Sequence, residues 1–218
     1  MIPSGVDVGH ADRMAWKYRD ARWVYDASRK FFLFGRHQAL LNLALPTDRP
    51  ARVLEIGCGT GHNLKILLRR FPHLKADGVD IAEPMLAAAQ HKLRRQPRAR
   101  LALGDAQDPS IGRAFGEDGY DGVLMSYSLS MVPDWSLGLR CALGGLKVGA
   151  RLSVVDFGCF EGWGRWGPIA IAGLTRNDAP PMLRLQEEAL LLDQTGWKVE
   201  HRSLFRGAVQ TLVVTRLA

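Results

Sequence analysis

The sequence is poor in cysteine and has no long apolar run. Its three cysteines, Cys58, Cys141 and Cys159, are widely spaced and form neither a CxxC pair nor a metal-ligand pattern with histidine. We therefore expect reduced thiols in a cytoplasmic protein, and no metal. No apolar stretch reaches the roughly 18 residues of a membrane span. The first residues also lack the basic-then-apolar pattern of a signal peptide, so any membrane contact should be peripheral.

Acidic residues are fewer than basic ones. The 218 residues include 22 Asp and Glu against 29 Lys and Arg, which gives a net charge of +7. This excess suits an anionic partner such as nucleic acid, a membrane surface or an acidic substrate. The composition is otherwise that of a globular protein, with 47% hydrophobic residues and no internal repeat. A single domain is expected.

Strand and helix patterns alternate from residue 51 onward. Apolar runs predict strands at 51–56, 74–81, 99–105, 120–127 and 149–157, with helices at 62–71, 83–95 and 134–146 between them. Such alternation predicts right-handed βαβ units and a parallel sheet covered on both faces. A helix at 184–196 and an antiparallel hairpin at 197–217 should follow. Residues 157–183, rich in Gly, Pro and Trp, should form a functional loop or lid.

The segment before this alternation has a different character. Residues 13–45 should be helical with a break near Gly35, so we divide the chain into an N-terminal helical lid or membrane-contact segment (1–48) and a larger domain (49–218). Arg22, Arg29 and Arg36 recur every seven residues among many aromatics. This composition fits an interfacial helix on anionic lipid. It fits equally a helix whose aromatics cover the sheet while its arginines face water.

Three glycines stand at the end of the first predicted strand, in "VLEIGCGTG" (53–61). Gly57, Gly59 and Gly61 would allow a tight turn and the close approach of a ligand. The stretch lacks the last glycine of a dinucleotide fingerprint and the Lys-Ser/Thr of a phosphate loop. Asp80, ending the second strand, can accept ribose hydroxyls, and Asp105, after the third, can accept an adenine amino group. Together these positions predict a nucleoside site with no pyrophosphate.

"VLEIGCGTG" combined with "VDI" and "GDA" resembles the class I S-adenosylmethionine-dependent methyltransferases. The resemblance implies a Rossmann-like α/β fold, with a seven-stranded sheet of order 3-2-1-4-5-7-6 and strand 7 antiparallel. It implies S-adenosylmethionine as cofactor and S-adenosylhomocysteine as product. Gly57 and Gly59 would pass the methionine portion, and Ile81 and Met85 would flank adenine. The full cofactor-binding set expected on this basis is Tyr25, Glu55, Gly57, Gly59, Asn63, Asp80, Ile81, Met85, Gly104, Asp105, Ala106 and Ser126.

The acceptor should meet the cofactor after the fourth strand, at 125–135. Nucleic-acid amino-methyltransferases carry Asn/Asp-Pro-Pro-aromatic there, whereas this chain has Ser126-Tyr127-Ser128-Leu129. We therefore expect no nucleic-acid substrate. The loop has no histidine and no cluster of metal ligands, which fits an amine acceptor because an amine needs only to lose a proton.

"WVYDASRKFFLFGRHQALL", "SYSLSMVPDW", "DFG" and "RNDAPP" resemble bacterial lipid N-methyltransferases acting on diacylglyceryl-homoserine or phosphatidylethanolamine. The resemblance implies up to three methylations of an amino-lipid headgroup at the anionic inner face of the membrane. Alternatives are a soluble small-molecule methyltransferase and an inactive cofactor-binding partner protein. In the lipid hypothesis the acceptor site comprises Tyr18, Tyr25 and Tyr127 as catalytic residues, Arg22 or Arg29 against the headgroup anion, and Trp163 and Trp166 on the lid. Each tyrosine could instead serve only in packing.

Overall fold

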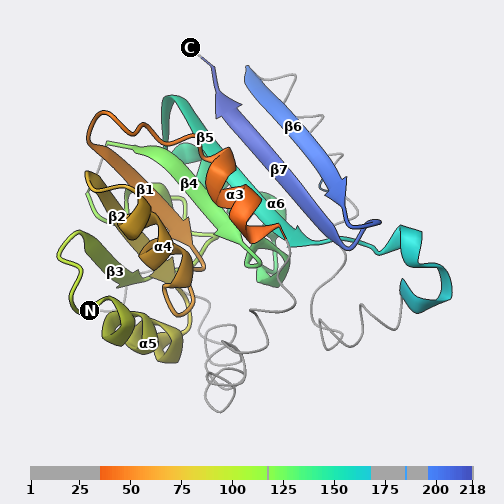
Figure 1. Cartoon of the computed structure of the whole chain (residues 1–218), viewed down its shortest axis with the longest axis horizontal. Coiled ribbons are helices and arrows are strands. Elements are labelled where there is room, and N and C mark those ends of the chain that lie inside the picture. Colours follow the sequence, from red (N-terminus) through yellow and green to blue (C-terminus); the bar gives the residue numbers. More distant parts are fainter. Residues whose placement is uncertain (1–34, 117, 168–184, 186–195, 218) are drawn as a thin grey trace.

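The computed structural model describes residues 35–116, 118–167, 185 and 196–217 (Figure 1). Its centre is a seven-stranded sheet of order β3-β2-β1-β4-β5-β7-β6, with β7 antiparallel to β5 and β6. The predicted sheet order is confirmed. The strands are β1 (Ala51–Ile56), β2 (Leu74–Asp80), β3 (Ala99–Leu103), β4 (Tyr120–Ser126), β5 (Leu146–Phe157), β6 (Trp197–Leu204) and β7 (Val209–Arg216).

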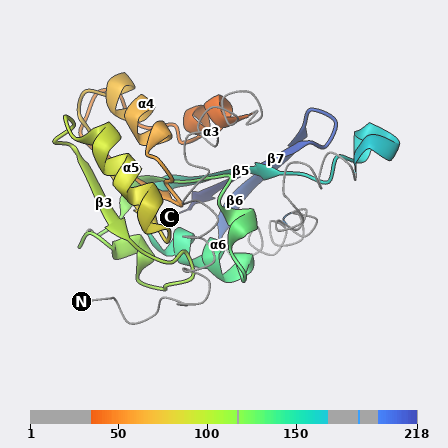
Figure 2. The ribbon, with the colours of Figure 1, turned by 90° about the horizontal axis from the view of Figure 1, so that it is seen from below.

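Helices cover both faces of the sheet, as the alternating pattern predicts (Figure 2). One face packs against α3 (Arg36–Asn42), α4 (His62–Arg70) and α5 (Glu83–Leu93), and the other against α6 (Trp135–Gly144). Three short 3-10 helices are η1 (Ile111–Arg113), η2 (Leu129–Met131) and η3 (Glu161–Trp166). Within the described ranges, no helix is both long and apolar enough to cross a bilayer.

Element boundaries differ from the predicted ones mainly around β5. This strand begins at Leu146, three residues earlier than predicted, and Leu146 itself had been assigned to the preceding helix. The early part of β5 pairs with β4 through Tyr120 and Leu146. At the N-terminal side, α3 begins directly after Gly35, whose φ of 77° is left-handed, and the break predicted near Gly35 stays a prediction because residues 1–34 lie outside the described ranges. The helices predicted before Gly35 and most of the helix predicted at 184–196 lie outside the described residues, and the boundary predicted at 48/49 falls between α3 and β1.

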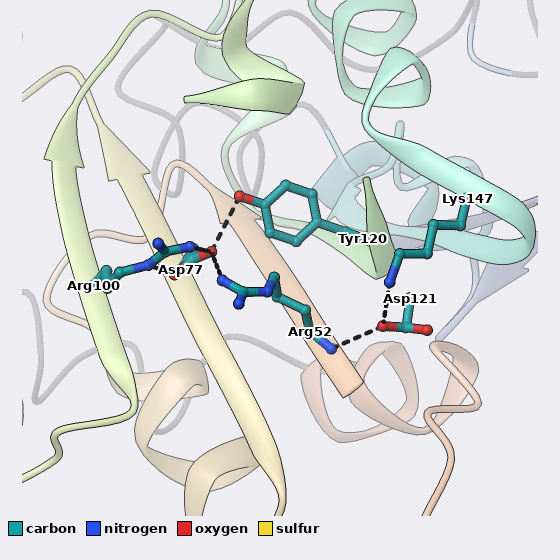
Figure 3. Close-up of polar contacts among 6 residues, drawn as sticks. All are labelled: Arg52, Asp77, Arg100, Tyr120, Asp121 and Lys147. Carbon is teal, nitrogen blue, oxygen red and sulfur yellow. Dashed lines mark hydrogen bonds and ion pairs between the residues drawn. The ribbon is translucent and has the colours of Figure 1, made fainter. Parts of the chain in front are cut away.

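A buried ionic cluster joins four neighbouring strands (Figure 3). Asp77 on β2 is fully buried and accepts two hydrogen bonds from Arg100 on β3, at 2.7 and 2.6 Å, and one of 3.1 Å from the Tyr120 hydroxyl on β4. Arg52 on β1 lies 3.6 Å from the same carboxylate. The bidentate arginine satisfies the hydrogen-bonding capacity of the buried carboxylate. The cluster therefore has a structural role, which is to hold the strands together.

Candidate functional site

The glycine turn joins β1 to α4 at the carboxyl edge of the sheet. Gly57, Gly59 and Gly61 have φ values of 72°, 53° and 71°, in the left-handed region that glycine adopts without strain. The amides of Gly57 and Cys58 donate to the Val79 carbonyl of β2, at 2.8 and 2.9 Å. The turn lies where β1 neighbours β4, the point at which the chain's strand order reverses. Open α/β sheets bind their ligands there.

Gly57 is needed for a reason that the sequence did not show. A Cβ added to it would overlap the Cβ of Ser128 and lie 2.9 Å from the Ser128 Oγ. Ser128 follows β4, and its hydroxyl donates to the Ile56 carbonyl at 2.9 Å. Close approach of a ligand was the expected reason for this glycine. The structure adds a protein neighbour, so the loop after β4 rests directly on the turn.

Asp80 supports the glycine turn from the end of β2. Its carboxylate is buried and accepts from the Gly59 amide at 2.7 Å and from the Ala82 amide at 2.9 Å. A carboxylate oxygen has more than one lone pair, so each can accept a further hydrogen bond from a ribose hydroxyl. Asp80, the residue predicted to bind ribose, therefore also holds the glycine turn in place.

A second carboxylate lies behind the turn. Glu55 on β1 is buried, and its Oε1 accepts from the Asn63 amide nitrogen on α4 at 2.6 Å. Burial, followed by the charges of Asp80 and Glu55, raises the pKa of the Cys58 thiol well above its ordinary value. Cys58 is therefore a neutral thiol. A neutral thiol is a poor nucleophile, and the two nearby carboxylates favour positive charge.

An apolar group lies beside Asp80. Met85 and Ala82 are buried and pack with the half-buried Ile81 and Met131. Ile81 and Met85 were expected to flank adenine, and the structure brings them together. Met131, on η2, was missed. Met131 lies in the loop of residues 125–135, which the sequence had indicated as functional. That loop was predicted to contact the methyl acceptor, so a contact of Met131 with the adenine side was not considered.

The end of β3 completes the same edge. The Gly104 amide donates to the Asp80 carbonyl at 3.1 Å. Asp105 is buried, and its Oδ1 accepts from the Gln107 amide at 2.9 Å. Ala106 packs against the core on the α6 side. Of these residues, Gly104 contacts Asp80 directly, and the role of Asp105 and Ala106 at the adenine edge stays a prediction.

Tyr127 follows β4 in a left-handed conformation, with φ 55°. Its amide donates to the Val155 carbonyl at 2.8 Å, and its buried ring lies edge-on to Phe157, with centroids 4.8 Å apart. The ring belongs to the core on the α3 and α4 side of the sheet. Ser126, at the end of β4, is also buried. A catalytic role for Tyr127 remains a prediction.

Asp156 was missed by the sequence analysis. It lies fully buried near the end of β5, where its Oδ1 accepts from the Ser130 hydroxyl at 2.6 Å and its Oδ2 from the Ser130 amide at 2.9 Å. The sequence feature that could have indicated Asp156 is an acidic residue near the carboxyl end of a predicted strand, in "VVDF". The contact fixes η2, and thereby Met131, against the sheet.

Six further predicted site residues belong to the N-terminal segment and to the predicted lid. Tyr18, Arg22, Tyr25 and Arg29 lie outside the described residues. Trp163 and Trp166 are on η3, at the end of the molecule opposite α5 (Figures 1 and 2). Among the residues placed in the structure, no three of His, Cys, Asp and Glu gather as a metal site.

Comparison with known proteins identifies the domain type. Residues 54–152 match the family model described as "Methyltransferase domain". A trans-aconitate 2-methyltransferase from Rhodopseudomonas palustris (strain BisB18) is 32% identical over 110 residues, which cover 50% of this chain and 40% of that protein. The chain thus spans less than half of this relative's length.

Solved structures share the fold. The plantazolicin methyltransferase BamL, in complex with a triazolic desmethylPZN analog and SAH, has a TM-score of 0.72 at 12% identity and covers 96% of each chain. Phosphoethanolamine N-methyltransferase 2 from Haemonchus contortus, in complex with S-adenosyl-L-methionine, has a TM-score of 0.65 at 15% identity, covering 85% of this chain and 53% of that one. The chain therefore has the class I S-adenosylmethionine-dependent methyltransferase fold, and its residues 54–152 match a methyltransferase-domain model.

Proposed function

We propose that this protein transfers a methyl group from S-adenosylmethionine to a small acceptor. The observation that carries the proposal is the hydrogen bond between Asp80 and the Gly59 amide, which joins the ends of two adjacent strands at the glycine turn. Asp80 would accept ribose hydroxyls, Ile81, Met85 and Met131 would enclose the adenine, and Asp105 would read its edge. These hydrogen-bond acceptors and apolar groups fit the cofactor.

The cofactor supplies a methyl group on a good leaving group, so the protein's work is mainly binding and positioning. The buried carboxylates Glu55 and Asp80 favour a cationic ligand electrostatically. Ser128 and Asp156 hold the loop after β4 in contact with the turn and the sheet. An acceptor arriving at this loop would meet a preorganised edge.

The acceptor class is the open part of the proposal. The name of the trans-aconitate relative favours a soluble small molecule over the lipid headgroup inferred from sequence. An amine-bearing lipid headgroup is the second candidate. It is favoured by one observation, the exposure of Trp163 and Trp166 beside Arg165 just beyond β5. The absence of the Asn/Asp-Pro-Pro-aromatic stretch after β4 supports an acceptor other than nucleic acid.

Labelled methyl transfer by the purified full chain tests the proposal. The acceptor panel comprises trans-aconitate, phosphoethanolamine, phosphatidylethanolamine and diacylglyceryl-homoserine, the last two in vesicles. Asp80→Ala is the matched variant, and it should lower turnover of any accepted compound at limiting cofactor. Failure to bind S-adenosylmethionine by calorimetry would overturn the proposal. Binding without turnover of a broad panel would support the inactive-partner alternative.

A further inference from the structure

Three large aromatic side chains are exposed at one end of the molecule. Trp163 is 44% exposed, Trp166 58% and Phe205 53%. The tryptophans lie on η3, directly after β5, and Phe205 lies in the turn between β6 and β7. Figures 1 and 2 both place η3 at the far end from α5. We call these three residues, with Arg165 and Arg206, the aromatic tip.

The aromatic tip is built by contacts between segments distant in sequence. The Phe160 amide donates to the Gly207 carbonyl at 2.9 Å and the Gly162 amide to the Arg206 carbonyl at 3.1 Å. The Trp163 indole donates to the Phe205 carbonyl at 3.1 Å. A Cβ on Gly162 would lie 2.6 Å from the Arg206 Cβ, so glycine permits this close packing. The exposed aromatics therefore stand on an ordered platform.

The segments that carry the aromatic tip include three residues in an unfavourable backbone conformation and one buried aromatic side chain. Phe160, Phe205 and Arg206 have φ values of 55°, 53° and 56°, which is unfavourable for residues with a side chain. Phe160 is buried and lies edge-on to Trp163, with centroids 5.4 Å apart. Strain of this kind persists where surrounding contacts impose it, often at functional sites. Here the strained turn presents Phe205 to solvent.

The charge beside the aromatics is positive. Arg165 lies over the Trp166 ring, 5.2 Å from its centroid, and Arg206 is exposed. The sequences 161–167 and 202–207 together contain three arginines and one acidic residue, Glu161. The third arginine, Arg202, lies 3.7 Å from Glu200. Trp and Phe with arginine are the side chains that favour the interface of an anionic bilayer.

We propose that the aromatic tip docks on the surface of an anionic lipid bilayer. Trp166 and Phe205 would enter the headgroup layer, and Arg165 and Arg206 would meet lipid phosphates. Docking would bring the end of the molecule that carries η3 to the membrane, with α5 at the far end. Binding to vesicles needs no turnover, so this inference stands apart from the proposed methyl transfer.

Flotation of the full chain with vesicles tests the inference. One vesicle type contains phosphatidylcholine alone and the other adds phosphatidylglycerol. We expect flotation with the second type only, weakened by salt because the arginines are exposed. Trp166→Ala with Phe205→Ala should reduce partitioning about tenfold or more, and Arg165→Gln with Arg206→Gln by a similar factor.

Matched controls come from the same chain. Arg69→Gln with Arg70→Gln removes equal charge at the end of α4, and Leu41→Ala with Val148→Ala removes exposed apolar side chains elsewhere. Both should float as the wild type does. Equal loss in tip and control variants, or flotation without anionic lipid, would overturn the inference. The inference would also be overturned if the chain did not float but self-associated, and if Trp166→Ala abolished that self-association. A second copy of the chain would then occupy the aromatic tip.

Discussion

The Asp80 carboxylate and the Gly59 amide are 2.7 Å apart, and their hydrogen bond ties the end of β2 to the turn after β1. The two residues were predicted to contact different parts of one cofactor, Asp80 its ribose and Gly59 its methionine portion. Their hydrogen bond couples the two contacts, because a displacement of Asp80 would also break the bond that holds the glycine turn. Loss of the carboxylate should therefore affect both the ribose contact and the path of the backbone.

Asp80→Ala should weaken S-adenosylmethionine binding about tenfold or more. Loss of a hydrogen bond to a charged group costs about 1.5–3 kcal/mol, and release of the turn adds to this. Calorimetric titration measures the affinity, with circular dichroism as the check on folding. Asp118→Ala, which removes an exposed carboxylate elsewhere, is the control. Unchanged affinity in a folded Asp80→Ala protein would remove Asp80 from the site.

Gly57→Ala should destabilise the fold more than Gly149→Ala. The two glycines have similar left-handed φ values, 72° and 77°, so an alanine costs about 1–2 kcal/mol of backbone strain at either. Only at Gly57 does the added Cβ meet Ser128; around Gly149 nothing lies within 4 Å. Urea unfolding of both variants measures the difference. Equal losses of unfolding free energy would mean that Ser128 moves aside freely.

Tyr127→Phe should lower single-turnover methyl transfer by about one to three orders of magnitude and leave cofactor affinity nearly unchanged. This outcome is expected for a group that acts on the acceptor alone. The ring packing against Phe157 and the left-handed backbone are compatible with phenylalanine, so the fold should survive. Tyr25→Phe should instead change affinity and rate together. If Tyr127→Phe turns over normally, Tyr127 is a packing residue.

Asp121→Asn should destabilise the protein at neutral pH but much less in acid. Burial acts to raise the pKa of Asp121, but hydrogen bonds from the Arg52 amide, Lys147 and Arg49 outweigh it and hold the pKa below its ordinary value. A depressed pKa stabilises the fold above the unfolded-state value of about 3.9, and this is lost as pH falls through the folded value. Urea midpoints at pH 7 and about pH 3 measure the gap. A gap that does not narrow in acid would contradict the assignment, and Asp118→Asn is the exposed control.

Much of the fold could be predicted because its signals are local. Apolar runs and glycine breaks placed β1, β2 and β4 within a residue or two, and the resemblance supplied the strand order. Asp80 was identifiable because an acid at a strand's carboxyl end faces the ligand edge. Burial of Asp80, Glu55 and Asn63 beside the turn agrees with that expectation.

The contacts between distant segments could not be predicted in this way. Ser128 against Gly57, Asp156 against Ser130, and η3 against the turn at Phe205 all join residues far apart in the chain. A sequence shows which side chains can form such bonds but not which ones meet. From the sequence, Trp163 and Trp166 could only be assigned to a predicted lid. The contact of η3 with the β6–β7 turn became apparent only in the structure.

The position of β7 between β5 and β6 affects how the sheet is completed during synthesis. One side of β5 pairs early with β4, but its other side must wait until residues 158–208 have been translated. At about 5–20 residues per second this takes several seconds. Throughout that interval the nascent chain exposes an unpaired strand rich in Val and Leu, which favours aggregation. Ribosome-associated chaperones should therefore bind this intermediate after β5 has emerged and leave it once β7 is inserted.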